Sequence, residues 1–129
     1  MTESSDFSLE GLRILIVEDE ESNYDLLRVI LKRYGPEILW AQDGQQAVDL
    51  MKNDDIDLVL MDLQLPVMNG LEATTEIKKM KSDVPVIAQT AYAMTEDRQK
   101  AINAGCDDYI VKPMKRSHLL EIIDKHISK

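Results

Sequence analysis

The sequence predicts an α/β fold in which five βα units, (βα)5, wind around one parallel sheet. Short apolar runs recur five times along the 129 residues, and each is followed by an amphipathic stretch of helical length. The first, third and fourth runs consist almost entirely of Leu, Ile, Val and Met, as is typical of strands that helices cover on both faces. We therefore expect these three strands in the centre of a doubly wound sheet.

The apolar runs define the expected strands. The second run contains Trp40 among polar neighbours, a pattern that favours an edge strand partly open to water, and the fifth is equally short. The expected strands are Leu12–Val17, Glu37–Gln42, Ile56–Met61, Val84–Thr90 and Tyr109–Lys112.

The intervening segments carry apolar side chains at spacings of three and four, which is the period of one helix face. Gly35 with Pro36 should end the first helix, and Gly105 should end the fourth. The expected helices are Glu21–Tyr34, Gln45–Lys52, Leu71–Met80, Thr95–Ala104 and Lys115–Ile127.

Composition limits the class of protein. Residues 11–129 should form a single domain, and the polar residues 1–10 a flexible N-terminal tail or linker. No apolar run approaches the ~20 residues that span a bilayer, and no signal peptide is evident, so we expect no membrane insertion and a cytoplasmic location. The single cysteine, Cys106, excludes intramolecular disulfides and should pack as a small hydrophobe. Net charge of −9 argues against direct nucleic-acid binding.

Polar residues follow or close four of the predicted strands. Glu18 and Asp19 follow the first run, Asp62 follows the third, Thr90 closes the fourth and Lys112 closes the fifth. The carboxyl ends of parallel strands share one edge, and ligands bind there where the strand order reverses. These residues should therefore meet in one pocket.

Three carboxylates in one pocket require a positive partner. At about 4 Å and an effective dielectric near 20, each like-charged pair costs on the order of 4 kcal/mol. Lys112 can offset one charge, and oxygen ligands with few carboxylates suit Mg²⁺. The sequence thus predicts a Mg²⁺ site at Asp19 and Asp62, with Glu18 acting through water. Asp62 beside a cation is a candidate nucleophile toward phosphorus, and Pro66 and Gly70 should shape the turn that follows it.

Four segments together resemble the receiver domain of two-component response regulators. They are Val17-Glu18-Asp19-Glu20, Met61-Asp62-Leu-Gln-Leu-Pro66-Val-Met68-Asn-Gly70, Ala88-Gln-Thr90-Ala91 and Asp108-Tyr109-Ile-Val-Lys112-Pro113. The resemblance spans about residues 11–129. It implies the flavodoxin-like strand order 2-1-3-4-5. Glu18 is a mild departure, because Asp is also common at that position.

The resemblance also implies a role for each matched residue. Asp62 would be the phosphorylation site, and Glu18, Asp19, Asp62 and the main-chain carbonyl of Gln64 would be the metal ligands. Thr90 and Tyr109 would be the switch pair. Lys112 would pair with the phosphoryl group, and together with Asp62 and Thr90 it would form the catalytic set.

The expected function follows from those roles. A histidine kinase or histidine phosphotransfer protein would donate a phosphoryl group to Asp62, and Thr90 and Tyr109 would then repack. The fourth helix, fifth strand and fifth helix would bind an effector or a second copy. On this interpretation the chain is a phosphoacceptor domain and not an enzyme in its own right.

Alternatives remain at this stage. The chain is either a free-standing receiver or a piece of a hybrid sensor histidine kinase. A Mg²⁺-dependent phosphatase with an aspartyl-phosphate intermediate lacks a second acid two residues after Asp62, where Gln64 stands. A flavin-binding electron carrier conflicts with the acids after the first strand, and the intact site argues against a degenerate receiver. His118 and His126 should be surface residues.

Overall fold

The computed structural model describes residues 7–65, 67–91, 95–112 and 115–127. Strands and helices alternate along this part of the chain, as the sequence predicts. The strands are β1 Arg13–Val17, β2 Glu37–Ala41, β3 Leu58–Asp62, β4 Val86–Thr90 and β5 Asp108–Val111. The helices are α1 Glu21–Lys32, α2 Gly44–Asn53, α3 Gly70–Met80, α4 Thr95–Ala104 and α5 Arg116–Ile127.

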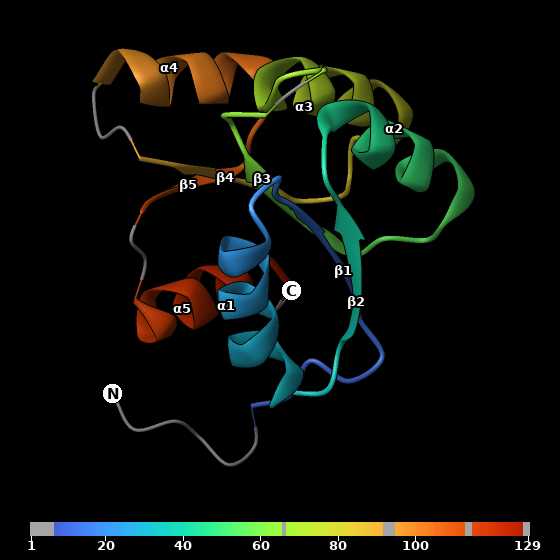
Figure 1. Ribbon diagram of the computed structural model, residues 1–129, viewed down its shortest axis with the longest axis vertical. Coiled ribbons are helices and arrows are strands. Elements are labelled where there is room, and N and C mark those ends of the chain that lie inside the picture. The colour runs from blue at the N-terminus through green and yellow to red at the C-terminus, as the bar shows by residue number, and fades with distance from the viewer. Residues whose placement is uncertain (1–6, 66, 92–94, 113–114, 128–129) are drawn as a thin grey trace.

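All neighbouring strands are parallel, and their order is β2-β1-β3-β4-β5. This confirms the predicted fold class, strand order and edge positions. Helices α1 and α5 cover one face of the sheet, and α2, α3 and α4 cover the other (Figure 1). Helices α1 and α2 lie on opposite faces, and β1 lies between β2 and β3, so the carboxyl ends of β1 and β3 flank the point where the strand order reverses.

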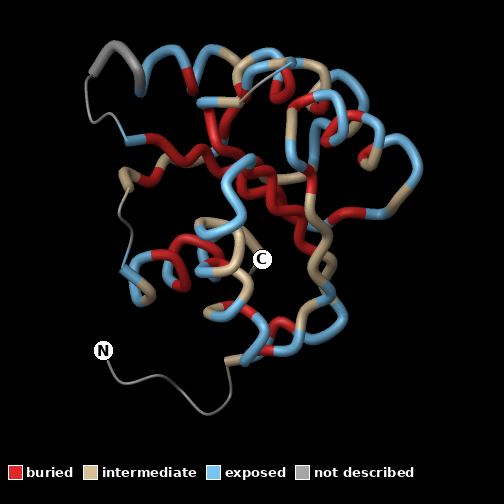
Figure 2. Tube along the Cα trace, viewed as in Figure 1, coloured by how far each residue is buried: buried red, intermediate tan, exposed pale blue. Residues whose placement is uncertain are grey.

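Alternating strand residues fill two apolar cores, one on each face of the sheet. Leu15 and Val59 point toward α2 and α3, whereas Ile14 and Leu60 point toward α1 and α5. Every residue of β3 and β4 is buried, and Figure 2 shows the buried trace concentrated along the central strands. Such two-sided burial explains why these runs are apolar without alternation.

The domain begins earlier than expected, because residues 7–10 are part of it. Leu9, assigned by sequence to a loose tail, is fully buried, and its N–H donates to the Tyr34 carbonyl at 2.7 Å. Phe7 packs edge-to-face on Tyr34, with ring centroids 5.0 Å apart. Phe7 and Leu9 alternate with polar residues. Two apolar residues are too short a pattern to distinguish a packed segment from a polar tail. The expected tail remains a prediction for residues 1–6, which lie outside the described part.

The turn after β3 ends at Gly70, whose N–H donates to the Leu63 carbonyl at 3.3 Å, in agreement with the sequence expectation for Gly70. Gly70 is the first residue of α3, and a Cβ there would lie 2.3 Å from the Asp62 carbonyl oxygen. Its role is to allow the close approach of α3 to the end of β3. Val67 adopts the left-handed backbone conformation, with φ of 66°. Pro66 lies outside the described residues. Asn69 then caps α3 through a reciprocal pair of hydrogen bonds with Glu72.

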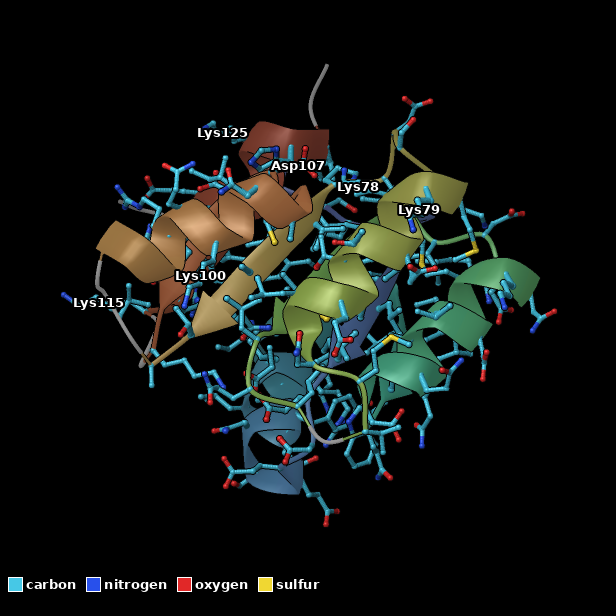
Figure 3. The ribbon with its side chains drawn as sticks, turned by 90° about the horizontal axis from the view of Figure 1, so that it is seen from above. Lys78, Lys79, Lys100, Asp107, Lys115 and Lys125 are labelled. Carbon is cyan, nitrogen blue, oxygen red and sulfur yellow. The ribbon has the colours of Figure 1, made fainter. Side chains whose placement is uncertain are left out.

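Lys78 connects α3 to the start of the last two strands. Its ammonium lies 2.6 Å from the Asp107 carboxylate and 2.7 Å from the Val84 carbonyl, and Figure 3 shows Lys78 and Asp107 side by side. Asp107 also accepts the Val86 N–H at 2.8 Å. None of the helices in the described ranges has the length and apolar character needed to cross a bilayer.

Candidate functional site

The ends of four strands bring the predicted polar residues together. Asp62 is the last residue of β3 and Thr90 the last of β4, whereas Glu18 directly follows β1 and Lys112 directly follows β5. Glu18, Asp62 and Thr90 are all buried. The sequence prediction that these distant segments converge at the carboxyl end of the sheet is confirmed.

Lys112 joins two of the carboxylates directly. Its Nζ lies 3.0 Å from Asp62 Oδ2 and 3.2 Å from Glu18 Oε1. Partial burial by itself would lower the pKa of Lys112, but the hydrogen bonds and charges of Asp62 and Glu18 raise it above the ordinary value. Lys112 therefore remains an ammonium across the physiological pH range.

Glu18, Asp19 and Asp62 form the acidic cluster. Each offers an oxygen within 4.8 Å of the others, and Asp19 is exposed whereas its two companions are buried. Burial, together with the nearby charge of Asp62, raises the pKa of Glu18 to about 7, although Lys112 and the Glu20 N–H act in the opposite direction. The carboxylates carry more negative charge than Lys112 can balance.

The donor set of the acidic cluster fits Mg²⁺. All of its ligand atoms are hard carboxylate oxygens, which Mg²⁺ prefers, and one of the three residues is exposed, so solvent can complete the coordination. The raised pKa of Glu18 reflects its burial first and the charge of Asp62 second, and a divalent cation would offset that charge. The predicted Mg²⁺ cofactor thus agrees with the geometry. The Gln64 carbonyl as a further ligand stays a prediction.

Asp62 is held in a fixed orientation beside residues that line a cavity. Its Oδ1 accepts the Gln64 N–H at 2.9 Å while its Oδ2 faces Lys112. A cavity of about 540 Å³ opens beside it. The cavity is lined by Asp19, Leu63, Gln64, Leu65, Asn69, Leu71, Thr90 and Lys100.

Lys100 is a cavity residue that the sequence analysis missed. It is an exposed residue of α4 (Figure 3) and borders the same cavity as Thr90. A lysine on the outer face of a helix carries no local signal, because only the packing of α4 across the sheet decides which lysine faces the cavity.

Tyr109 lies half-buried on β5 at the surface that α4 shares with that strand. The guanidinium carbon of Arg98, on α4, is 5.5 Å from the centre of the Tyr109 ring, a cation–π distance. The backbone N–H of Tyr109 donates to Asp108 Oδ1 at 2.9 Å. The structure therefore places Tyr109 beside α4, where a change in its rotamer would alter the outer surface.

The expectation that both histidines are surface residues is wrong for His126. His118 is exposed, but His126 is half-buried, and its Nε2 lies 2.8 Å from Asp108 Oδ2. Partial burial would raise the pKa of Asp108, but the hydrogen bonds from His126 and the Tyr109 N–H lower it overall. A partner eighteen residues away on β5 cannot be found from helix spacing. Cys106 is buried as predicted, and burial raises the pKa of its thiol to about 11.

Comparisons with known proteins show which family the chain resembles. The model of the response regulator receiver domain matches residues 14–124. Hybrid signal transduction histidine kinase I of Dictyostelium discoideum is 39% identical over 91% of this chain, which corresponds to 7% of that protein. The polar-differentiation response regulator DivK of Brucella ovis is 38% identical, over 88% of this chain and 94% of that protein.

Two solved structures are similar in fold and sequence. The receiver domain of sensor histidine kinase PA1611 from Pseudomonas aeruginosa PAO1 superposes with a TM-score of 0.86 at 38% identity, covering 92% of this chain and 99% of that chain. That crystal structure holds a magnesium ion coordinated in the active site cleft. The receiver domain of Ssk1 from Saccharomyces cerevisiae, solved with the histidine phosphotransfer protein Ypd1, has a TM-score of 0.86 at 32% identity, over 92% and 90% of the two chains.

The chain belongs to the response regulator receiver domain family. It is therefore a signalling domain of two-component phosphorelays, and receiver domains interact with histidine kinases or phosphotransfer proteins. The chain spans only 7 to 13% of the length of the first hybrid kinase and sensor kinase that it matches.

Proposed function

We propose that Asp62 accepts a phosphoryl group from a phosphohistidine donor and that this changes the surface formed by α4, β5 and α5. The observation that carries the proposal is the pair of contacts at the Asp62 carboxylate. One oxygen accepts a hydrogen bond from the Gln64 N–H and the other accepts one from Lys112. The two residues that follow Asp62, Leu63 and Gln64, line an open cavity. A carboxylate so oriented, with a cation at 3.0 Å, is suited to an in-line displacement at phosphorus.

The proposed transfer is balanced without any further reactant. An Asp62 carboxylate oxygen forms a bond to phosphorus while the bond between phosphorus and the donor imidazole nitrogen breaks. The imidazole keeps the electron pair of that bond and takes up one proton from water, which gives the neutral histidine side chain. The product is an acyl phosphate on Asp62 and a histidine on the donor.

Glu18, Asp19 and Asp62 would hold Mg²⁺, and the Gln64 carbonyl would be an additional ligand. When bound, the cation offsets the charge of the carboxylates and of the incoming phosphoryl oxygens. Lys112 is 22% exposed and contacts two of the acids, so its ammonium can follow a phosphoryl oxygen as charge builds up on Asp62.

Thr90 and Tyr109 would transmit the change. Thr90 is buried and borders the cavity at the end of β4, so its hydroxyl can hydrogen-bond a phosphoryl oxygen on Asp62 after a small inward movement. That movement would free space for the Tyr109 ring, which would then leave Arg98. Loss of this contact would alter the outer face of α4 and β5, where an effector or a second copy could bind.

The partners and location remain proposals. The likeness to the Ssk1 receiver, which was solved with Ypd1, supports a histidine phosphotransfer protein or a histidine kinase as the donor. The similarity to DivK favours a free-standing regulator, whereas the similarity to hybrid kinases favours a piece of such a kinase. A cytoplasmic location is proposed for either case. A phosphatase lacks support, because Gln64 stands where a second acid would be needed.

Phosphorylation with a small donor tests the acceptor. The protein should gain one phosphoryl group from acetyl phosphate and Mg²⁺, as measured by intact mass, and EDTA should prevent it. Asp62→Asn should abolish the gain, whereas the matched variant Asp57→Asn, at the opposite end of the sheet, should leave it unchanged. Modification that persists in Asp62→Asn would place the acceptor elsewhere, and multiple turnover of small phosphoesters would favour the phosphatase.

A further inference from the structure

The indole of Trp40 connects three elements beside the acidic cluster. Its Nε1–H donates to the main-chain carbonyl of Glu18 at 2.8 Å. Its ring stacks on Tyr24, with centroids 4.1 Å apart and planes inclined by 6°. Trp40 belongs to β2, Tyr24 to the first turn of α1, and Glu18 follows β1. One side chain therefore contacts Glu18, at the start of the loop 18–20, and the first turn of the helix that follows the loop.

The contacts with β2 occupy both main-chain polar groups of Glu18. The Glu18 N–H donates to the Ala41 carbonyl at 2.9 Å, and the Glu18 carbonyl accepts from Trp40. The Glu18 backbone is thus tied to two consecutive residues at the end of β2. The orientation of the buried Glu18 carboxylate depends on this attachment, because a rotation of its peptide would break the Trp40 bond.

The stack on Tyr24 holds the other end of the loop. Glu20, at the N-cap position of α1, makes no capping hydrogen bond with its side chain. The Tyr24 N–H makes the first hydrogen bond of the helix, to the Glu20 carbonyl at 3.0 Å, and the Tyr24 ring packs on the indole. Stacked aromatic pairs contribute beyond their buried area, so Trp40 provides packing at a helix start that has no side-chain cap.

We infer that Trp40 is a positioning residue for the metal site, which acts by holding the loop that carries Glu18 and Asp19 against Asp62. This inference rests on the proposed binding of Mg²⁺ at the acidic cluster. The three carboxylates repel one another in the metal-free protein, and a freely moving loop would let them separate. Metal binding would then have to bring the carboxylates back together, and the free energy that this costs would lower the affinity. The same loss occurs when the outer partners of metal ligands are removed.

Mg²⁺ affinity measured by isothermal titration calorimetry tests the N–H bond. Trp40→Phe keeps an aromatic ring for Tyr24 but removes the donor to Glu18, and we expect the dissociation constant to rise about three- to tenfold. Leu39→Ala is the matched control. It lies next to Trp40 in β2 and packs into the core on the opposite face, so it should lower the thermal midpoint and leave the dissociation constant within about twofold.

A second pair of variants tests the stack. Tyr24→Leu should weaken Mg²⁺ binding, whereas Tyr24→Phe, which keeps the ring, should restore wild-type affinity. This pair also serves if Trp40→Phe fails to fold. Wild-type affinity in folded Trp40→Phe, or in Tyr24→Leu, would overturn the inference, as would an equal loss in Leu39→Ala. Absence of Mg²⁺ binding in the wild-type protein would instead refute the proposed metal site itself.

Discussion

The two ends of the sheet carry similar charged groups with different consequences. At the amino end, Arg13 lies 3.2 Å from Glu37 and 3.4 Å from Asp54, and these three side chains are 29 to 62% exposed. At the carboxyl end, Lys112 lies at comparable distances from Glu18 and Asp62, which are 0 and 4% exposed. Water screens the first group but has little access to the second.

The comparison teaches that burial, and not the number of charges, distinguishes the functional end. Arg13 also donates its main-chain N–H to Asp57 at 2.8 Å, so the amino end is a set of surface contacts in which only the Arg13 Nε is buried without a hydrogen-bond partner. Three acids and one lysine lie together at the carboxyl end, with an open cavity beside them. Burial and the charge of Asp62 raise the pKa of Glu18 there to about 7. Such an arrangement is stable only with a cation or a proton nearby.

The largest expected effect is the loss of the buried cation. Lys112→Met keeps the side-chain volume but leaves Glu18 and Asp62 without their ammonium partner. We expect the free energy of unfolding to fall by about 3 kcal/mol at pH 8 in the absence of metal, as measured by urea denaturation. Added Mg²⁺ should restore part of this loss. If the free energy of unfolding of Lys112→Met fell no more than that of an Arg13 variant, burial would not explain the difference between the two ends of the sheet.

A stabilising change of intermediate size is expected at Glu18. Its folded-state pKa of about 7 lies above the ordinary value of 4.5, so the metal-free protein should lose stability as pH rises from about 4.5 to 7 and the buried group ionises. Glu18→Gln removes this ionisation. It should raise the unfolding free energy by roughly 1–3 kcal/mol at pH 8 and have little effect below pH 4.5.

The control for this variant is Glu37→Gln at the amino end, whose carboxylate is exposed. It should leave the unfolding free energy at pH 8 within about 0.5 kcal/mol of wild type, because exposed ion pairs contribute little. The same urea series in excess Mg²⁺ should reverse the order of wild type and Glu18→Gln, because only the wild type gains from the metal. An identical pH profile in the two proteins would contradict the burial argument.

A smaller gain is expected from relieving backbone strain after β3. Val67 has φ of 66° and an 84% exposed side chain, and a β-branched residue is strained in this region. Val67→Gly should stabilise the protein by about 0.5–1 kcal/mol, after the greater chain entropy of glycine is counted. Val67→Ala keeps a Cβ and should gain less. Thermal unfolding distinguishes them, and an equal gain in both would contradict the role of φ.

The smallest effect is expected at the amino end. Arg13→Met removes the contacts with Glu37 and Asp54, which water already screens. The thermal midpoint should fall slightly in low salt, and the difference should disappear at about 1 M salt, where the screening length is ~3 Å. A large fall in the thermal midpoint that does not depend on salt would mean that the exposed contacts of Arg13 are as strong as the buried contacts of Lys112.

Most of the fold could be predicted because burial on two sides leaves a strong signal. The central strands appear as uninterrupted apolar runs, and all five strands and all five helices lie within two residues of their expected positions at every end. The N-terminal limit of the domain was missed, because the burial of Leu9 depends on the distant Tyr34. The bond between His126 and Asp108 was missed for the same reason.

The sequence by itself determined which residue types stand at the strand ends, since parallel strands joined by helices must bring Glu18, Asp62, Thr90 and Lys112 to one edge. Only the tertiary structure decided how deeply each is buried, and with it the pKa of Glu18. It also decided that Trp40, expected to be an edge-strand residue, bonds to Glu18. The reason is physical: connectivity follows from local patterns, whereas solvent access and side-chain contacts arise when separate elements pack.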